Sequence, residues 1–424
     1  MTRRNLQKKR GNFLHSGIIL TALLVSLALG FFPTASHSTS YAAGGFPFIG
    51  VLYAGQRPEG IAVDTQTHIV YIAYEGPGLV VGFDPSSGHV RWKTPFADTV
   101  SDVQVDSTTH RVYAASSSFR NRKSVLSVLD GATGKILLTA TIGSGDNGIA
   151  IDTKRQRVYV SSSDSGEVNA FTLRTSPTGQ LSAIPSTLII GPHPQAIGVN
   201  SHLGRLYVGD ISDNIITVYD EDKSRIMAII SVAALPVQPL RVDESNGRVY
   251  VVCSNGQELD VIDGNTNEVI ANVPTGPYPE GVAYNTATGR IYVANEGHQD
   301  NSFADNTVNT TITVIDGQTF DVLGTLNVGR SPDGVEADPQ LRRVYVALEE
   351  SDAVVEVSDS VDLPLIPAAN LHQAAAAHTA ISALQVAFDV TIVLMVLTII
   401  AATLVALSQR WRARETPRTL PGDV

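Results

Sequence analysis

The residues best placed to do chemistry are seven polar side chains that occupy one equivalent position in an internal repeat. Each stands at the junction that enters an alternating, strand-like stretch, as Glu280 does before residues 281–285. Three of the seven are acidic, and oxygen ligands of this kind suit hard cations and polyols. We therefore predict a ring that binds a cation or a polyol-like ligand. Its members are Glu59, Ser101, Asn147, Gln195, Gln238, Glu280 and Asp333.

Other groups of reactive residues give weaker signals. The loop over residues 295–311 holds Glu296, His298, Asp300 and Asp305, without the regular acidic spacing of a calcium loop. A long loop of this kind more often marks a partner contact. The histidines do not recur at one repeat position, so they cannot form a ring of imidazole ligands for copper or iron. We predict no catalytic residues, since the chain has neither a Gly-x-Ser-x-Gly motif nor a Cys-x-x-Cys-His haem site.

The elements that must position these residues repeat along the chain. A tyrosine flanked by aliphatic or small residues recurs at spacings of 42, 46, 48, 43, 42 and 53 residues. Repeats of roughly 40 to 50 residues with four strands each are the sequence mark of a propeller blade. The sequence therefore predicts an all-β fold, a seven-bladed β-propeller of four-stranded antiparallel blades over residues 46–360. The repeated tyrosines are Tyr71, Tyr113, Tyr159, Tyr207, Tyr250, Tyr292 and Tyr345.

The strand before each tyrosine ends in Asp or Asn. These residues bond to nearby backbone N–H groups where a chain turns back, so we interpret them as turn residues rather than as a metal or acid–base site. The tyrosines are interpreted as packing between blades, with a partner for each hydroxyl. Cys253, the single cysteine, falls in a predicted strand and is interpreted as a packed core thiol.

The two ends of the repeat region complement each other. The seventh unit lacks a fourth strand, because prolines interrupt residues 363–367. Residues 48–53 form a strand without a repeat of its own, placed like the other fourth strands just ahead of the next junction. We therefore expect the N-terminal strand to complete the last blade, since closure removes the open edges of the ring.

One copy of the repeat carries a recognisable motif, Tyr-Val-Ala-Asn at residues 292–295. With its flanking strands it resembles the YVTN family of β-propeller repeats. The resemblance covers about residues 46–360, although the copies at Tyr207 and Tyr345 keep only part of the motif. That family is found in exported and surface-layer proteins of bacteria and archaea. The resemblance implies the fold rather than the function, since propellers host enzymes, binding proteins and scaffolds alike.

The N-terminus predicts export. Basic residues precede an apolar run over residues 17–32, and small residues follow it. This is the three-part layout of a signal peptide, which we predict over residues 1–42. The apolar run is short for a membrane span, so cleavage is favoured over an uncleaved anchor.

The C-terminus predicts a membrane anchor. Residues 390–407 are almost entirely apolar and meet the length of a membrane helix, which we predict over residues 384–408. A stalk or linker at residues 361–383 precedes it. Three arginines begin the tail, residues 409–424, and place that tail in the cytoplasm. The expected location is the cell membrane, crossed once, with the propeller outside.

The formal net charge of −11 argues against a nucleic-acid partner, since phosphate binding needs a concentrated basic face. We predict a non-catalytic, membrane-anchored binding or scaffold module for a protein or glycan at the cell surface. The alternative is a divalent-metal-dependent hydrolase or lyase with its site at the channel mouth, and a third possibility is a sensor whose helix passes a signal inward. For the ring alone, the alternative interpretation is that residues at a wet channel mouth are simply polar. No cofactor is predicted, although a structural or bound divalent cation could occupy the ring.

Overall fold

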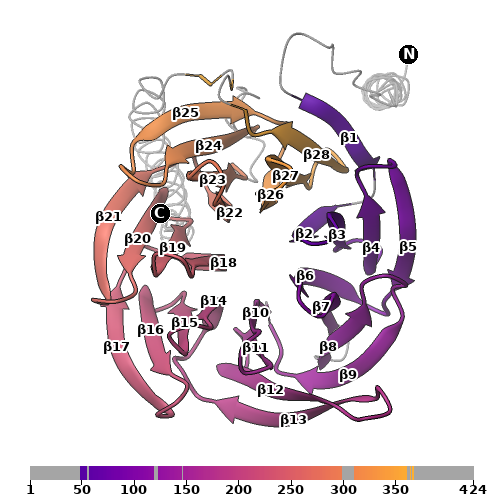
Figure 1. Ribbon diagram of the computed structural model, residues 1–424. Coiled ribbons are helices and arrows are strands. Elements are labelled where there is room, and N and C mark those ends of the chain that lie inside the picture. Colours follow the sequence, from indigo (N-terminus) through magenta and orange to yellow (C-terminus); the bar gives the residue numbers. More distant parts are fainter. Residues whose placement is uncertain are drawn as a thin grey trace, which may run out of the picture. The chain divides into compact units, whose positions relative to one another are not determined.

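The computed structural model describes residues 48–54, 57–118, 123–145, 147–297, 310–360, 363 and 365–366. The chain divides into two units, Met1–Phe46 and Pro47–Val424, and every described residue lies in the second. In the described residues, 28 strands form seven four-stranded antiparallel sheets. Figure 1 shows these sheets as blades arranged around a central axis. The predicted all-β, seven-bladed propeller is therefore confirmed.

The first strand of each blade lies innermost and contacts the first strand of the next blade. The strand of the seventh blade contacts that of the first, so the contacts run around the whole ring. The innermost strands are β2 (Pro58–Asp64), β6 (Thr99–Asp106), β10 (Ile149–Asp152), β14 (Pro194–Asn200), β18 (Pro236–Asp243), β22 (Pro279–Asn285) and β26 (Pro332–Asp338).

The second strand of each blade carries the repeated tyrosine, which exposes at most 2% of its surface in every copy. The Tyr71 hydroxyl donates to the carbonyl of Gly131 in the next blade at 3.2 Å, as expected for packing between blades. Among the described residues, the buried hydroxyls of Tyr207 and Tyr345 find no hydrogen-bond partner, so the expected partner is not general. The second strands are β3 (Ile69–Tyr74), β7 (Arg111–Ser118), β11 (Arg157–Ser162), β15 (Arg205–Asp210), β19 (Arg248–Cys253), β23 (Arg290–Asn295) and β27 (Arg343–Leu348).

The third and fourth strands carry each blade outward to the rim of the propeller (Figure 1). The third strands are β4 (Leu79–Asp84), β8 (Lys123–Asp130), β12 (Glu167–Thr175), β16 (Ile215–Asp220), β20 (Glu258–Asp263), β24 (Thr311–Asp316) and β28 (Ala353–Ser358). The rim strands are β5 (His89–Pro95), β9 (Ile136–Ile142), β13 (Leu181–Leu188), β17 (Arg225–Ser231), β21 (Glu268–Pro274), β25 (Val322–Asn327) and β1 (Phe48–Ala54).

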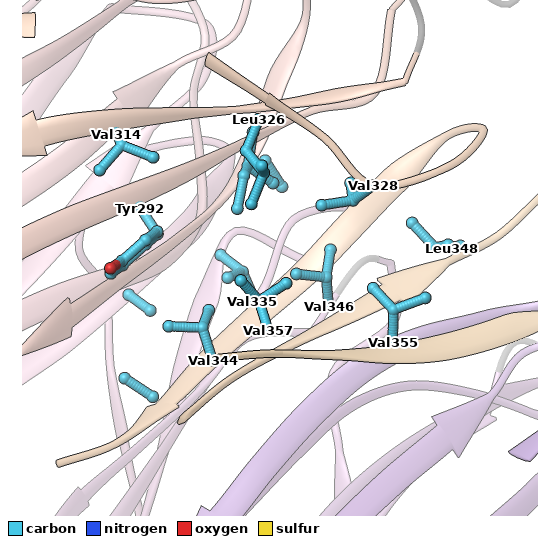
Figure 2. Close-up of a cluster of buried hydrophobic side chains, with 14 of the residues drawn as sticks. Tyr292, Val314, Leu326, Val328, Val335, Val344, Val346, Leu348, Val355 and Val357 are labelled. Carbon is cyan, nitrogen blue, oxygen red and sulfur yellow. The ribbon is translucent and has the colours of Figure 1, made fainter. Parts of the chain in front are cut away.

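Apolar clusters fill the space between neighbouring blades. The cluster in Figure 2 joins Tyr292 and Val314 of the sixth blade with Val335, Val344 and Val355 of the seventh. Valine predominates among its labelled members because β-branched side chains pack well on a pleated surface. Burial of this apolar surface is the main favourable contribution to folding, and it couples each blade to its neighbours.

The turn after each first strand is capped by the Asp or Asn that ends the strand. Asp64 Oδ1 accepts the backbone N–H groups of Gln66 and Thr67, at 2.9 and 3.2 Å. The same kind of bond forms in all seven blades, which confirms that these residues are turn residues. They therefore belong to the scaffold and not to a site.

The N-terminal strand closes the ring, as expected. β1 pairs antiparallel with β28, and the sheet order in the last blade is β1-β28-β27-β26. The described residues after β28 add no further strand to the seventh blade. Ile366 instead forms an isolated antiparallel bridge with Thr325 of β25, on the rim of the sixth blade.

The predicted signal peptide, the membrane helix, the tail and most of the predicted stalk lie outside the described residues. Within the part of the chain that the structure describes, no helix is long and apolar enough to cross a membrane.

Candidate functional site

Five of the seven predicted ring residues line one cavity of about 310 Å³, which we call the mouth cavity. The innermost strands all begin at the same end of the central axis, so the residues that open these strands gather there. The five come from the first, second, fourth, sixth and seventh blades. They are Glu59, Ser101, Gln195, Glu280 and Asp333.

Of the other two predicted residues, Asn147 is not among the described residues that line this cavity, and the side chain of Gln238 is not described. Asn147 is fully buried. Its side-chain amide donates to the carbonyl of Gly145 at 2.6 Å, and its Oδ1 accepts from Ser162 at 3.1 Å. Asn147 therefore stabilises a turn in its own blade. Gln238 lies in β18, and its side chain is outside the described part of the structure, but the adjacent Pro239 lines the cavity.

A second group of acidic residues, which the sequence analysis did not assign to the ring, lines the same cavity. Glu75, Glu296 and Glu349 each follow the second strand of a blade directly. They belong to the first, sixth and seventh blades, which also supply the three acidic ring residues. Aligning the residue after each second strand would have found them, since the equivalent positions elsewhere are Ser163, Ile211 and Ser254.

The six carboxylates therefore occupy three adjacent blades, and we call them the acidic sector. Its members are Glu59, Glu75, Glu280, Glu296, Asp333 and Glu349. Among the described residues lining the mouth cavity, Arg57 is the one cation. Its Nη2 lies 2.8 Å from Glu75 Oε2, and its Nε donates to Glu349 Oε1 at 2.9 Å.

Arg57 shows how this sector holds a guanidinium. It joins carboxylates of the first and seventh blades, and its backbone N–H donates to Asp352 Oδ1 at 3.0 Å. The hydrogen bond to Glu349 raises the pKa of Arg57, which therefore remains charged. Among the described residues of the lining, the acidic sector sets six carboxylates beside one arginine, so this lining is predominantly acidic.

In this acidic lining the carboxyl of Asp333 has a raised pKa. Loss of water around its carboxyl raises the pKa well above the ordinary value, and the charges of Glu280, Glu296 and Glu349 raise it further. A cation placed beside Asp333 would relieve this repulsion. The mouth cavity is therefore more favourable for a cation than for a neutral or anionic group.

Asp102 adds a carboxyl on the wall of the same cavity. It exposes 7% of its surface, accepts the backbone N–H of Ile149 in the next blade at 2.8 Å, and accepts from Gln104 at 3.2 Å. Burial raises the pKa of Asp102 to about 6. The other six blades carry Gly, Ala or Pro at this position, because the next blade comes close: a Cβ on Gly334 would lie 2.2 Å from the carbonyl oxygen of Glu59.

An ion pair crosses the channel farther along the innermost strands. Arg241 of the fifth blade bonds to Glu336 of the seventh, and these blades are not neighbours. Four of the other blades carry Ala or Gly at the same position. Arg241 lines a second cavity of about 210 Å³, which shares Gln104 and Pro239 with the mouth cavity. The channel therefore continues beyond the mouth into a smaller cavity with a more aliphatic lining.

Metal ligands do not converge here in the usual pattern. Across the described residues, no group of three or more His, Cys, Asp and Glu side chains is arranged to hold a metal ion. His68 and His110 lie at the turns on the opposite end of the strands, where they contact Asp338 and Asp64. Of the long acidic loop, Glu296 lines the cavity, while His298, Asp300 and Asp305 lie outside the described residues.

The fold and this mouth define a seven-bladed β-propeller with an acidic opening to its channel. No family model matches the chain. It is similar to the uncharacterized protein YncE of Salmonella typhi and of Salmonella typhimurium, at 21% identity over 253 residues, 56% of this chain and 69% of each relative. That distant likeness fits a YVTN-type propeller.

Among solved structures, the β-propeller domain of Myceliophteria thermophila Cps50 (Swd1) is similar, with a TM-score of 0.61 and 11% identity. The match covers 74% of this chain and 99% of that domain. At this identity the likeness shows the fold alone.

Proposed function

We propose that this protein is a non-catalytic binding module whose mouth cavity holds a cationic group of a partner protein. The observation that carries the proposal is the acidic sector, six carboxylates on three adjacent blades around a cavity whose described lining holds one cation. Lysine and arginine side chains are the groups in proteins that such an acidic lining attracts, and complementary charge guides both encounter and register. Arg57 supplies an example from within the chain, since carboxylates from two blades bind it.

A protein partner fits the cavity better than a glycan does. Sugar-binding sites combine hydrogen-bonding groups with apolar or aromatic surfaces. None of the described residues that line the mouth cavity is aromatic, and acidic side chains outnumber the apolar ones. The wall therefore offers charge rather than a stacking platform.

The proposed setting is the cell surface. The basic and apolar N-terminal residues support export, and the apolar stretch at residues 390–407 with the arginines behind it supports a single membrane helix. In this setting the propeller would face a partner outside the cell. Cleavage of the tail by a protease that is added on the cytoplasmic side of the membrane, and not by one added outside, would support this orientation.

Binding of a lysine decapeptide to the full-length protein in detergent micelles tests the proposal. The triple variant Glu59→Gln, Glu280→Gln, Asp333→Asn removes three charges from the acidic sector. We expect it to bind the peptide at least tenfold more weakly, which corresponds to about 1.4 kcal/mol. Binding to the parent protein should also weaken as salt rises, because exposed charges are screened.

A matched variant separates the site from the net charge. Glu268→Gln, Asp321→Asn and Asp222→Asn remove three charges at turns on the opposite end of the blades. This control should bind like the parent protein, while an acetylated peptide should bind neither. Equal loss in both triple variants would refute a local site. Tight binding of calcium alone, in the absence of peptide binding, would favour the metal-dependent alternative instead.

A further inference from the structure

The chain leaves the last blade through a clamp on the sixth blade. Asp359 directly follows β28 and exposes 1% of its surface. Its carboxylate accepts from Arg290 at 2.8 Å and from Asn285 at 2.6 Å, and also from Thr288, all residues of the sixth blade. At the equivalent position three other blades carry glycine, whereas the fourth blade carries Glu221, which contacts Tyr159 and Arg157 of the third blade. A buried acidic residue therefore joins neighbouring blades at two boundaries, and one of them is the exit of the chain.

The next described residues continue over the sixth blade. Arg290 also donates to the carbonyl of Ser360 at 2.6 Å. Leu363 and Leu365 then pack against the apolar cluster between the sixth and seventh blades, the cluster of Figure 2. These leucines add apolar contacts to a boundary that is already buried.

The segment ends on the rim strand β25. Thr325 and Ile366 exchange both backbone hydrogen bonds, at 3.0 and 2.8 Å. Gly324 makes room for this contact, because a Cβ there would lie 2.5 Å from the carbonyl oxygen of Ile366. Its φ of 150° also favours glycine. The equivalent rim positions of the fifth and fourth blades hold Ala271 and Ala228, which have a Cβ.

We propose that Asp359, Ser360, Leu363, Leu365 and Ile366 form a strap that is a second lock on the ring. The first lock is β1, which pairs with β28 through two register shifts. The strap fastens the chain beyond the last blade to the sixth blade by a buried ion pair, two leucines and a strand bridge. It also covers part of the rim edge of β25, whose free backbone groups would otherwise be open to pairing.

The strap determines which blade first bears a force applied to the C-terminal part of the chain. Force applied beyond Ile366 reaches the sixth blade through Thr325, Leu365 and Arg290 before it reaches β28. The sheet that β1 closes is thereby protected from being peeled open. The source of such a pull rests on the proposed membrane anchor, whereas the lock itself does not.

A cysteine pair in the full-length protein tests the strap. Residues that exchange both hydrogen bonds across an antiparallel pair have Cα atoms about 5.5 Å apart, which suits a disulfide. We expect Thr325→Cys with Ile366→Cys to cross-link under mild oxidation, detected by mass spectrometry. Asn272→Cys with Ile366→Cys is the matched control, since Asn272 holds the equivalent register position on β21. This control should not cross-link.

Single-molecule pulling from the two chain ends tests the lock. Oxidation of the Thr325–Ile366 cysteine pair should raise the force of the first rupture, and reduction should restore it. Leu365→Ala, which leaves no buried charge unpaired, should lower that force, and Asp359→Asn should lower it more. Failure to cross-link, or a first rupture force that none of these changes moves, would overturn the proposal. Neither outcome depends on peptide binding at the mouth, so the two proposals fail separately.

Discussion

The innermost strands carry acidic residues at both of their ends, and the two ends use them differently. At the turn end every blade has Asp or Asn, and the side-chain oxygen of each accepts a backbone N–H of the turn. At the mouth end the residue type varies from blade to blade, and the acids gather on three adjacent blades. Uniform positions in the repeat therefore form the scaffold, while variable ones carry the candidate site.

The same contrast is visible in the pKa values of two aspartates. Burial alone would raise the pKa of Asp64, but hydrogen bonds from His110 and from the backbone of Gln66 and Thr67 outweigh it and lower the pKa. At the mouth, burial and the neighbouring carboxylates raise the pKa of Asp333. A carboxylate that is fully supplied with donors stabilises the fold. A carboxylate that is surrounded by like charges is repelled by them, and a bound cation would reduce this repulsion.

The largest effect is expected from breaking a turn-end aspartate. Asp64→Ala removes the acceptor of two backbone N–H groups and the contact with His110, at 2.7 Å, that joins the second blade to the first. We expect a loss of about 2–3 kcal/mol in the free energy of unfolding, measured with urea. Because the pKa of Asp64 is lowered in the fold, its stabilisation is present above the ordinary pKa and is lost as pH falls. The parent should therefore lose more stability on acidification than the variant.

Asp64→Asn is the control for this prediction. It keeps the Oδ1 acceptor of the turn and removes only the charge that faces His110. We expect a loss of about 1 kcal/mol. Equal losses for both variants would show that the turn cap adds nothing, and the contrast between the two strand ends would not hold.

The next largest effect is expected at Glu221, a buried acid at the turn end whose pKa is raised rather than lowered. Glu221 follows Asp220 at a position where three other blades carry glycine, and it exposes 3% of its surface. The Tyr159 hydroxyl donates to it at 2.5 Å, yet burial raises the pKa of Glu221 to about 7. Since this value lies above the ordinary one, its stabilisation is full below about pH 4.5 and is lost as pH rises toward 7.

Glu221→Gln should remove that pH dependence. We expect the parent to lose about 1–2 kcal/mol of unfolding free energy between pH 5 and 8 relative to the variant, measured by urea unfolding at each pH. Asp222→Asn serves as the control, because its side chain is 65% exposed and should leave the profile as it is. Parallel pH profiles for parent and Glu221→Gln would mean that this buried carboxyl is not protonated in the fold.

The sequence predicted the scaffold better than the site, for a physical reason. Turn caps, tyrosines and strand alternation depend on neighbours within one repeat, so they can be read from the repeat itself. Alignment of the copies also placed five ring residues at one mouth. It did not show that Asn147 turns back into its own blade, or that Arg241 meets Glu336 across the channel, since these depend on which side chains face each other across the axis.

The smallest effect compares the two ends of one strand, β26. Asp338 caps the turn through Gln340 and Leu341 and contacts His68 at 2.6 Å, whereas Asp333 faces the acidic sector. Because the pKa of Asp333 is raised, the charge of its carboxylate costs stability as pH rises. Asp333→Asn should therefore raise the free energy of unfolding at pH 8 by about 0.5–1 kcal/mol, and it should weaken binding of the lysine peptide. Asp338→Asn should instead lower the free energy of unfolding and leave peptide binding unchanged. Urea unfolding and peptide titration of the two variants would show these opposite effects. A change of the same sign in the free energy of unfolding of both variants would mean that repulsion between carboxylates does not destabilise the mouth.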